Sequence, residues 1–328
     1  MQAVVYHRYG PPADVLEFCE IEKPSPGAGE VLIEIRAASV NPYDWHFVRG
    51  TPKFVRVFTG LRRPKSPRAG ADAAGVIAGI GAGVTRFRAG DAVFGVCKGS
   101  FAEFACAGEN KIAFMPANLD FEQAAAVPIA GLTALQGLRD CGRVHAGQRV
   151  LIHGAAGGVG TFAVQIGKWL GAHVTGVCGT RNLEMVQAIG ADEAIDYTVQ
   201  DFTSARHQYD VIFDLIGNHP LKTMLAALRP RGIYVGCGGG GPEKTSRELL
   251  GIMLGRFLYA PFTRRRLTGV FTKMKAEDLE LVRGLLQSGK IRPVLDRSYP
   301  LRDVASALSY IEAGHARGKV TIALGLGN

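Results

Sequence analysis

The sequence predicts a two-domain α/β protein, and three observations lead to that prediction. The chain has 328 residues, which is enough for two domains with separate hydrophobic cores. Its first part, to about residue 124, contains short apolar runs closely punctuated by Gly and Pro, as in a small β-rich domain. After Phe121, strand and helix patterns alternate, which predicts right-handed βαβ units and a doubly wound parallel sheet.

The expected elements follow from local patterns. In the β-rich part we expect strands at Val31–Ile35, Gly75–Ile80 and Asp91–Gly95. In the alternating part we expect strands at 149–153, 173–177, 192–197, 211–215 and 233–237, and helices at 122–127, 133–138, 159–170 and 182–189. Past Arg266 we expect amphipathic helices at 278–287 and 304–312 and a last strand at 319–324.

Composition narrows the class of protein. Hydrophobic residues make up 47% and charged residues 20%, no apolar run reaches membrane-spanning length, and the N-terminus shows no secretory signal, so we expect a cytoplasmic protein. The net charge of +9 suggests either nucleic-acid binding or a basic surface that favours an anionic cofactor. Because the basic residues are scattered and no nucleic-acid motif is present, we expect no nucleic-acid partner. None of the six cysteines forms a CxxC pair, so neither a disulfide framework nor a zinc–cysteine site is indicated.

The most informative segment is a glycine-rich turn between a predicted strand and a predicted helix. It runs from Gly154 to Gly160, with Ala155 where a dinucleotide fingerprint has its first glycine. Gly157 would let the backbone approach a pyrophosphate, and Gly160 would let the helix pack close to the sheet. The helix N-terminus would then offer N–H groups to the phosphates. We therefore expect cofactor contacts from Ala156, Gly157, Gly158 and Val159.

The end of the next strand indicates which dinucleotide is bound. An Asp or Glu there would bind the ribose hydroxyls of NAD, but this chain has Gly179, Thr180 and Arg181. Thr180 can donate a hydrogen bond and Arg181 can pair with a 2′-phosphate, which favours NADPH over NADH. Arg181 is alternatively a solvated residue at a helix start.

These motifs, taken together, resemble the zinc-free medium-chain dehydrogenase/reductases, in particular their quinone oxidoreductase-like branch. The resembling segments are Ala37–Trp45, Gly70–Val76, Val84–Gly95, Ala155–Gly160, Gly289–Pro293 and Gly314–Lys319. The resemblance implies a GroES-like catalytic domain formed by residues 1–124 and 267–328 and a Rossmann NADP-binding domain over 125–266. It also implies an active site in the cleft between them, and homodimers formed through the edges of the nucleotide-domain sheets.

The resemblance further implies hydride transfer without zinc. Where zinc alcohol dehydrogenases have a Cys, a His and a Glu, this chain has Asn41, Ala71 and Asp72, and it cannot supply the three or four ligands of a zinc site. Without a Lewis acid, reduction of a small lipophilic electrophile, a quinone or an α,β-unsaturated carbonyl, is the expected reaction, and NADPH-dependent reduction of simple carbonyls is the alternative.

Asn41 and Tyr43 are the candidate catalytic residues. Asn41 would donate to the acceptor oxygen or to the nicotinamide ribose. Tyr43, Trp45 and His46 would shape the same pocket, or would simply pack in the core.

The resemblance places other residues at the cofactor: Thr133, Tyr197, Gly217, Gly238, Val270, Phe271, Arg317 and Lys319. One further segment, Leu249–Phe271, combines apolar residues with Arg264, Arg265 and Arg266. It is interpreted as a lid over the substrate or an interface, or alternatively as a surface for lipid or a partner in a non-enzymatic protein that retains the fold.

Overall fold

A computed structural model describes residues 1–204, 206–237, 263–314 and 316–324. The chain forms two compact units. The first contains Met1–Leu132, Lys273–Gly289 and Pro293–Asn328, and the second contains Thr133–Thr272 and Lys290–Arg292. In the described part of the chain, no helix is long and apolar enough to cross a membrane.

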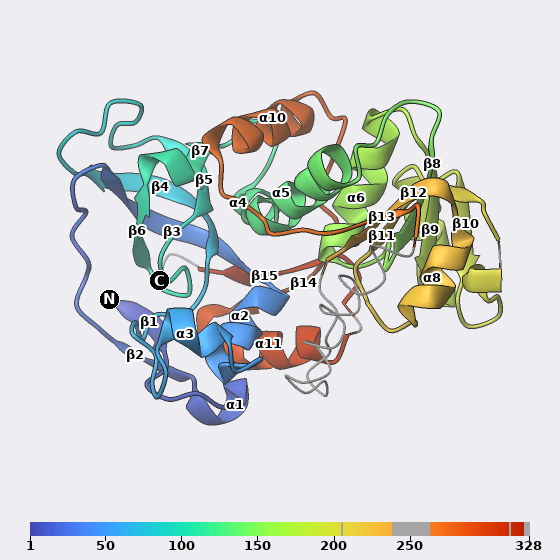
Figure 1. The fold of residues 1–328 in the computed structure, drawn as a ribbon. Coiled ribbons are helices and arrows are strands. Elements are labelled where there is room, and N and C mark those ends of the chain that lie inside the picture. Colours follow the sequence, from blue (N-terminus) through green and yellow to red (C-terminus); the bar gives the residue numbers. More distant parts are fainter. Residues whose placement is uncertain (205, 238–262, 315, 325–328) are drawn as a thin grey trace. The chain divides into compact units, whose positions relative to one another are not determined.

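The first unit is built mainly on antiparallel strands (Figure 1), and β14 and β15 form its one parallel pair among the described strands. Its larger sheet has the strand order β14-β15-β3-β4-β5-β7, with β6 paired to β3, and β1 pairs with β2 in a separate ribbon. The strand bounds are Gln2–Val5 (β1), Glu17–Glu20 (β2), Glu30–Val40 (β3), Asp72–Ile80 (β4), Ala92–Val96 (β5), Phe104–Gly108 (β6), Ile112–Phe114 (β7), Leu295–Pro300 (β14) and Lys319–Ala323 (β15). The C-terminal strand β15 pairs with β3, so both ends of the sequence form one sheet.

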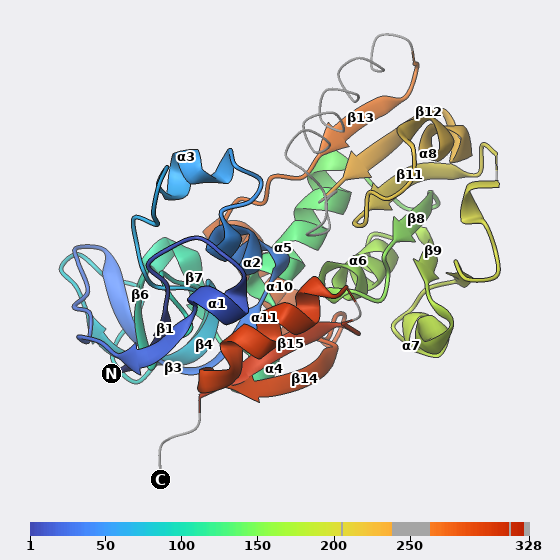
Figure 2. The same cartoon turned by 90° about the horizontal axis from the view of Figure 1, so that it is seen from below.

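Short helices pack on this sheet and along its edges. Their bounds are Pro12–Val15 (α1), Pro42–Arg49 (α2), Val55–Thr59 (α3), Phe121–Ala125 (α4), Pro128–Gln136 (α5, which continues into the second unit), Ala276–Gln287 (α10) and Val304–Glu312 (α11), with 3-10 turns at Glu109–Lys111 and Leu301–Asp303. Figure 2 shows α11 beside α1 and α2. Helix α4 packs on β3, β4 and β15, so residues 121–132, assigned partly to the nucleotide domain by the sequence, lie in the first unit.

The second unit contains a six-stranded sheet in the order β10-β9-β8-β11-β12-β13, and every neighbouring pair is parallel. Its strands are Arg149–His153 (β8), His173–Cys178 (β9), Glu193–Asp196 (β10), Tyr209–Asp214 (β11), Leu228–Gly236 (β12) and Arg266–Gly269 (β13). Its helices are Gly158–Trp169 (α6), Leu183–Ala188 (α7) and Leu221–Ala227 (α8), with a π-helical turn at Gly137–Cys141 and 3-10 turns at Thr180–Asn182 and Phe202–Ser204. The strand order reverses at β8, which confirms the predicted doubly wound α/β fold.

The spacing of apolar residues explains how α6 packs. Phe162 and Ile166 are four residues apart, lie on one helix face and are completely buried. Close packing also fixes Gly137, because a Cβ atom there would lie 2.5 Å from the ring of Phe213 on β11. The sheet of the second unit is therefore supported by a tightly packed core.

One buried carboxylate organises the carboxyl ends of three adjacent strands. Asp214, at the end of β11, accepts hydrogen bonds from His153 Nδ1 at 2.9 Å and from the Tyr234 hydroxyl at 2.6 Å. The backbone N–H groups of Ile216 and Gly217 also donate to it, at 3.1 and 2.8 Å. Burial opposes ionisation of Asp214, but these partners outweigh burial and lower its pKa to about 2.

This network predicts a large loss of stability when the carboxylate is removed. Asp214→Ala leaves His153, Tyr234 and two backbone donors without their acceptor, so we expect the free energy of unfolding to fall by roughly 3–5 kcal/mol. Urea unfolding at neutral pH measures it. As a control, Asp140→Ala removes an exposed carboxylate that pairs with its neighbour Arg139, and should change stability by less than about 1 kcal/mol. Equal effects of the two substitutions would contradict the assigned role of Asp214.

Candidate nucleotide site and active site

The glycine-rich turn lies where the sequence predicted it, between β8 and α6. Gly154 adopts a φ of +92°, and its N–H and that of Ala155 both donate to the Val177 carbonyl on β9. A Cβ atom on Gly160 would lie 2.1 Å from the Gly154 carbonyl oxygen, so only glycine fits at that helix position. The turn is thus fixed against the neighbouring strand, and the helix starts directly above it.

The start of α6 fits a dinucleotide pyrophosphate. Thr161 makes the first intrahelical bond, from its N–H to the Gly157 carbonyl, which leaves the N–H groups of Gly158, Val159 and Gly160 without an acceptor in the helix. Gly157 is the N-cap residue and has no side chain to satisfy them. Among the described residues, a Cβ atom on Gly157 would meet only the Gly154 oxygen, at 3.6 Å, so these residues leave space beside the turn. Backbone donors and the helix dipole therefore both favour an anion there.

The predicted 2′-phosphate residues gather at the ends of β9 and β10. A Cβ atom on Gly179 would lie 3.3 Å from the Tyr197 hydroxyl, so the exposed Tyr197 ring lies against the Gly179 backbone. The Thr180 hydroxyl is 3.1 Å from the Thr198 hydroxyl. Arg181 is exposed and follows directly. The structure thus brings these predicted contacts together on one edge of the sheet.

Sequence reasoning missed a carboxylate beside these residues. Asp196 ends β10 and accepts bonds from the Thr198 N–H at 2.9 Å and the Thr198 hydroxyl at 2.7 Å. A hydrogen bond from Thr180, and then those from Thr198, lower the pKa of Asp196. Asp196 belongs to the next strand, so the residues of the loop after β9 do not reveal it. The pairing of β10 with β9 would have revealed it, because it places Asp196 beside Cys178 at the end of β9.

The predicted cofactor residues Thr133, Gly217, Val270 and Phe271 are dispersed over the second unit. Thr133 is buried, and its hydroxyl lies 2.6 Å from the Thr272 hydroxyl. Gly217 has a φ of +67°, and its N–H donates to Asp214. Val270 N–H donates to the Gly236 carbonyl, and the Phe271 side chain is exposed. Gly238 and residues 249–262 of the predicted lid lie outside the described residues.

In the first unit, Asn41 lies in a buried polar cluster formed by β3, β4 and β15. It is the N-cap residue of α2, and its N–H donates to Asp44 Oδ2 at 2.8 Å. Its side-chain Nδ2 donates to Asp72 Oδ2 at 3.0 Å, and its Oδ1 accepts from Lys319 Nζ at 2.6 Å. Lys319 also donates to the Val40 carbonyl at 3.1 Å. Because an ammonium only donates and a carboxylate only accepts, the orientation of the Asn41 amide is determined.

This arrangement assigns Lys319 a contact that the sequence did not predict. Its side chain, expected near the cofactor, bonds Asn41 and lies 3.6 Å from Asp72. Arg317, expected near the cofactor too, is exposed, and its N–H donates to Asp296 at 2.9 Å. Asn41 and Lys319 are 278 positions apart in the sequence, so no local pattern reveals this contact.

Burial makes the charges of this cluster interdependent. The side chains of Lys319 and Asp72 are 3% and 0% exposed. Burial raises the pKa of Asp72 and lowers that of Lys319, and each charge opposes the shift of the other. Ser39 and the Ile129 N–H also donate to Asp72. Burial, with the charge of Asp72 adding to it, raises the pKa of Asp44 to about 7.

The ammonium has a chemical consequence for Asn41. Its positive charge on Oδ1 draws electron density from the amide, which makes the N–H groups of Asn41 stronger donors. The Nδ2 group donates to Asp72, and a side-chain hydrogen bond from Asn41 also lowers the pKa of Asp44 against the effect of burial. The cluster therefore holds the polarised Asn41 amide in a fixed orientation, between the Lys319 ammonium and the carboxylates of Asp72 and Asp44.

The aromatic neighbours of Asn41 differ in their environments. Trp45 is 4% exposed, belongs to the hydrophobic core and stacks on His46, which supports the core-packing interpretation of Trp45. Tyr43 is 45% exposed and its ring lies 4.0 Å from that of Phe47. Burial, and then the charge of Asp44, raise the pKa of Tyr43 to about 12, so its phenol is a neutral donor at pH 7.

Within the described ranges, no three His, Cys, Asp or Glu side chains are grouped as metal ligands. The positive charge beside Asn41 and Asp72 comes from Lys319. Cys97 is buried, and burial raises the pKa of its thiol, which disfavours the thiolate that zinc binds.

Comparisons with known proteins place this geometry in a family. Residues 27–118 match the alcohol dehydrogenase GroES-like domain, and residues 189–322 match a domain described as zinc-binding dehydrogenase. The chain is 32% identical over 335 residues to the chloroplast envelope quinone oxidoreductase homolog of Arabidopsis thaliana, covering 98% of both proteins. It is also 32% identical to the NADPH-dependent alkenal/one oxidoreductase of that plant, covering 98% of this chain and 79% of the relative.

Solved structures agree with these relatives. The quinone oxidoreductase of Coxiella burnetii superposes with a TM-score of 0.85 at 29% identity, with 99% of each chain covered. The Escherichia coli quinone oxidoreductase in complex with NADPH gives a TM-score of 0.82 at 26% identity, covering 99% of this chain and all of the other. With the fold, the glycine-rich turn and these relatives in agreement, the chain belongs to the medium-chain dehydrogenase/reductase family, in its quinone oxidoreductase-like branch.

Proposed function

We propose that this protein is an NADPH-dependent reductase that transfers hydride to a quinone or an α,β-unsaturated carbonyl without zinc. The observation that carries the proposal is the Asn41 amide, which Lys319 and Asp72 hold in one orientation and which the Lys319 ammonium makes a stronger donor. Relatives named quinone oxidoreductase and alkenal/one oxidoreductase support the same choice of acceptor.

The residues of the second unit fit the cofactor. When bound, NADPH supplies the hydride. The N-terminal N–H groups of α6 would hold its pyrophosphate, and Arg181 and Thr180 would hold the 2′-phosphate. The hydrogen bonds from Thr180 and Thr198 stabilise the charged form of Asp196, so Arg181 would have to outweigh this negative charge where a 2′-phosphate would approach.

The residues of the first unit would stabilise the charge that develops during reduction. As an enone or quinone carbon accepts the hydride pair, the carbonyl π electrons move to the oxygen, and a proton from solvent completes the reduction. Asn41 would donate to that oxygen, and the Lys319 ammonium strengthens the donor through Oδ1. The neutral phenol of Tyr43 is a second donor on the same helix. A fixed donor assists the transition state more than the ground state.

The acceptor class is tested by following NADPH oxidation with quinones, enals, enones and saturated ketones. A polarised N–H is sufficient for conjugated acceptors, which are already electrophilic, and we expect them to be reduced much faster than saturated ketones. Reduction confined to saturated ketones would replace the proposal by the simple-carbonyl alternative.

Asn41→Ala tests the donor. We expect turnover to fall by about tenfold or more with little change in NADPH affinity, because the lost hydrogen bond acts mainly in the transition state. Steady-state kinetics and fluorescence titration with NADPH measure the two quantities. Asn118→Ala is the matched control, since that amide donates to the Leu286 carbonyl elsewhere in the first unit.

Two outcomes would contradict the donor role. If NADPH affinity collapses while turnover at saturation survives, Asn41 positions the cofactor instead. If Asn41→Ala and Asn118→Ala behave alike, Asn41 is structural.

Cofactor preference gives an independent test. We expect NADPH to bind at least about tenfold more tightly than NADH, since charge-assisted hydrogen bonds to a 2′-phosphate supply that difference. Arg181→Ala should weaken NADPH binding and leave NADH binding, its internal control, unchanged. Equal affinities of the native protein for both cofactors would refute the preference.

Metal analysis tests the absence of zinc chemistry. Because the Lys319 ammonium bonds Asn41 and balances Asp72, we expect no stoichiometric zinc and full activity in chelator. Mass spectrometry of the purified protein measures the metal content. One zinc per chain, with activity lost on its removal, would overturn this part of the proposal.

The edge of the six-stranded sheet bears on how the protein assembles. Strand β13 is the edge of the six-stranded sheet, and pairing of two such edges would form the expected homodimer. The cytoplasmic location stays a prediction from the sequence.

A further inference from the structure

Three large apolar side chains are exposed on one short segment of the first unit. Phe54 is 52% exposed, Val57 61% and Leu61 72%, and all three lie on or beside α3. Side chains of this size are normally buried when they occur so close together on a monomeric surface. The segment Lys53–Arg68, which we call the basic loop, therefore presents an apolar surface without cover in this unit.

Hydrogen bonds and a cation–π contact hold the basic loop in its conformation. The Tyr9 hydroxyl lies 2.7 Å from both the Thr59 hydroxyl and the Gly60 carbonyl oxygen. The Arg56 guanidinium covers the Tyr9 ring at 4.5 Å, and its Nε donates to the Gly50 carbonyl at 2.9 Å. The Lys65 N–H donates to the Thr59 carbonyl at 2.7 Å. These bonds fix the backbone, so the outward position of the apolar side chains is a built feature of the loop.

The same loop is strongly basic. The sequence has no Asp or Glu between Asp44 and Asp72. Arg62, Arg63 and Lys65 are exposed, and none has an ion-pair partner among the described residues. Because no carboxylate of the loop itself balances them, these cations are available to an external anion.

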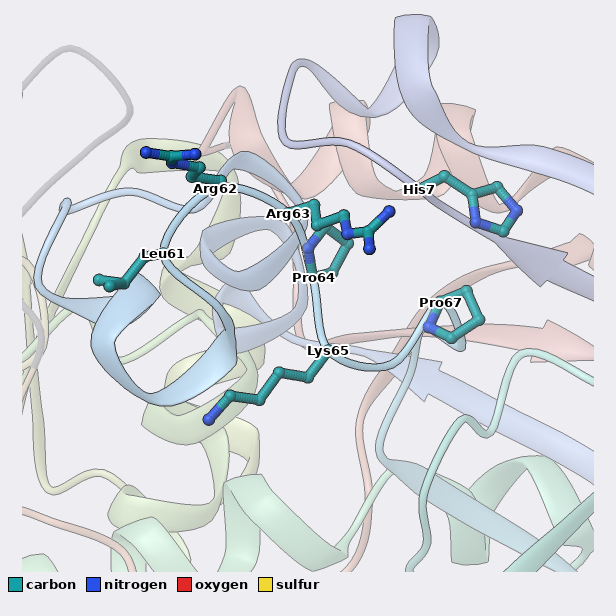
Figure 3. Close-up of a pocket in the computed structure, with 7 residues that line it drawn as sticks. All are labelled: His7, Leu61, Arg62, Arg63, Pro64, Lys65 and Pro67. Atoms are coloured by element: carbon teal, nitrogen blue, oxygen red, sulfur yellow. The ribbon is translucent and has the colours of Figure 1, made fainter.

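A hollow of about 540 Å³ lies between these cations and His7. Leu61, Pro64 and Pro67 complete its lining. Figure 3 shows Arg63 extending toward His7, while Arg62 and Lys65 point away on either side. Cations around a hollow, next to exposed apolar side chains, match the headgroup and acyl regions of an anionic lipid.

We propose that the basic loop docks this protein on an anionic lipid surface. Arg62, Arg63 and Lys65 contact the phosphate headgroups, and Val57 and Leu61 insert among the upper acyl carbons. A nucleic acid would pair with the cations but leave the apolar residues in water, so lipid accounts for both features. The proposal does not depend on the reductase activity and concerns a surface outside the Asn41 cluster.

Vesicle flotation tests the proposal with the full chain. We expect the protein to float with vesicles of mixed phosphatidylglycerol and phosphatidylcholine, to float less as salt rises, and not to float with phosphatidylcholine alone. Arg62→Glu with Arg63→Glu should lower the partition coefficient by about tenfold or more. Some binding should persist at high salt, because apolar insertion is not screened by ions. Val57→Ser with Leu61→Ser should weaken this salt-resistant binding.

Matched controls separate docking from general charge and folding. Arg88→Glu with Lys290→Glu makes the same change of net charge at exposed positions outside the loop, and should float like the native protein. NADPH oxidation with a water-soluble acceptor should be unchanged in every variant, which shows that each is folded. Native protein that stays with the soluble fraction, or loop and control variants that float equally, would overturn the proposal.

Discussion

The Lys319 ammonium lies inside the first unit, 2.6 Å from Asn41 Oδ1 and 3.6 Å from the Asp72 carboxylate. Three strands meet at this contact, because β3 leads into Asn41, β4 begins at Asp72 and β15 begins at Lys319. A buried charge is tolerated only when it is paired and hydrogen-bonded, so each of these side chains depends on the other two. The pairing of β15 with β3, which joins the two ends of the sequence, brings the ammonium to the amide.

The two halves of the proposed chemistry are constructed differently. In the second unit the anion-binding groups are backbone N–H donors, and their positions follow from the turn, from Gly160 and from the bonds between Asp214 and the adjacent loop. In the first unit the donor is one side chain whose orientation depends on buried charges. Backbone donors are kept when side chains change. The role of Asn41 is lost when its side chain changes, because Lys319 requires the amide oxygen and Asp72 requires the amide N–H.

Local patterns explain which parts of this structure could be predicted. The strand 149–153 and the helix 304–312 were predicted with the bounds they have, since apolar periodicity is a local signal. Helix α2 was not predicted, because its eight residues are too few for a clear apolar periodicity. Its main local signal is the N-cap residue Asn41. Likewise, the contacts of Lys319 with Asn41 and of Asp196 with the NADPH-preference residues depend on strand pairing. Such contacts join residues far apart in sequence, and no window of neighbouring residues contains them.

The excess of positive charge has a structural explanation that composition alone did not provide. The sequence suggested either a nucleic-acid partner or a generally basic surface, because its cations are scattered along the chain. In the structure, several of them are neutralised locally, as Arg49 is by Glu312 and Lys168 by Asp192. Arg62, Arg63 and Lys65 lie instead in a stretch without carboxylates, beside exposed apolar side chains. The local balance of charge and apolar exposure, and not the total charge, therefore supports the proposed partner: a surface that offers both anions and hydrocarbon.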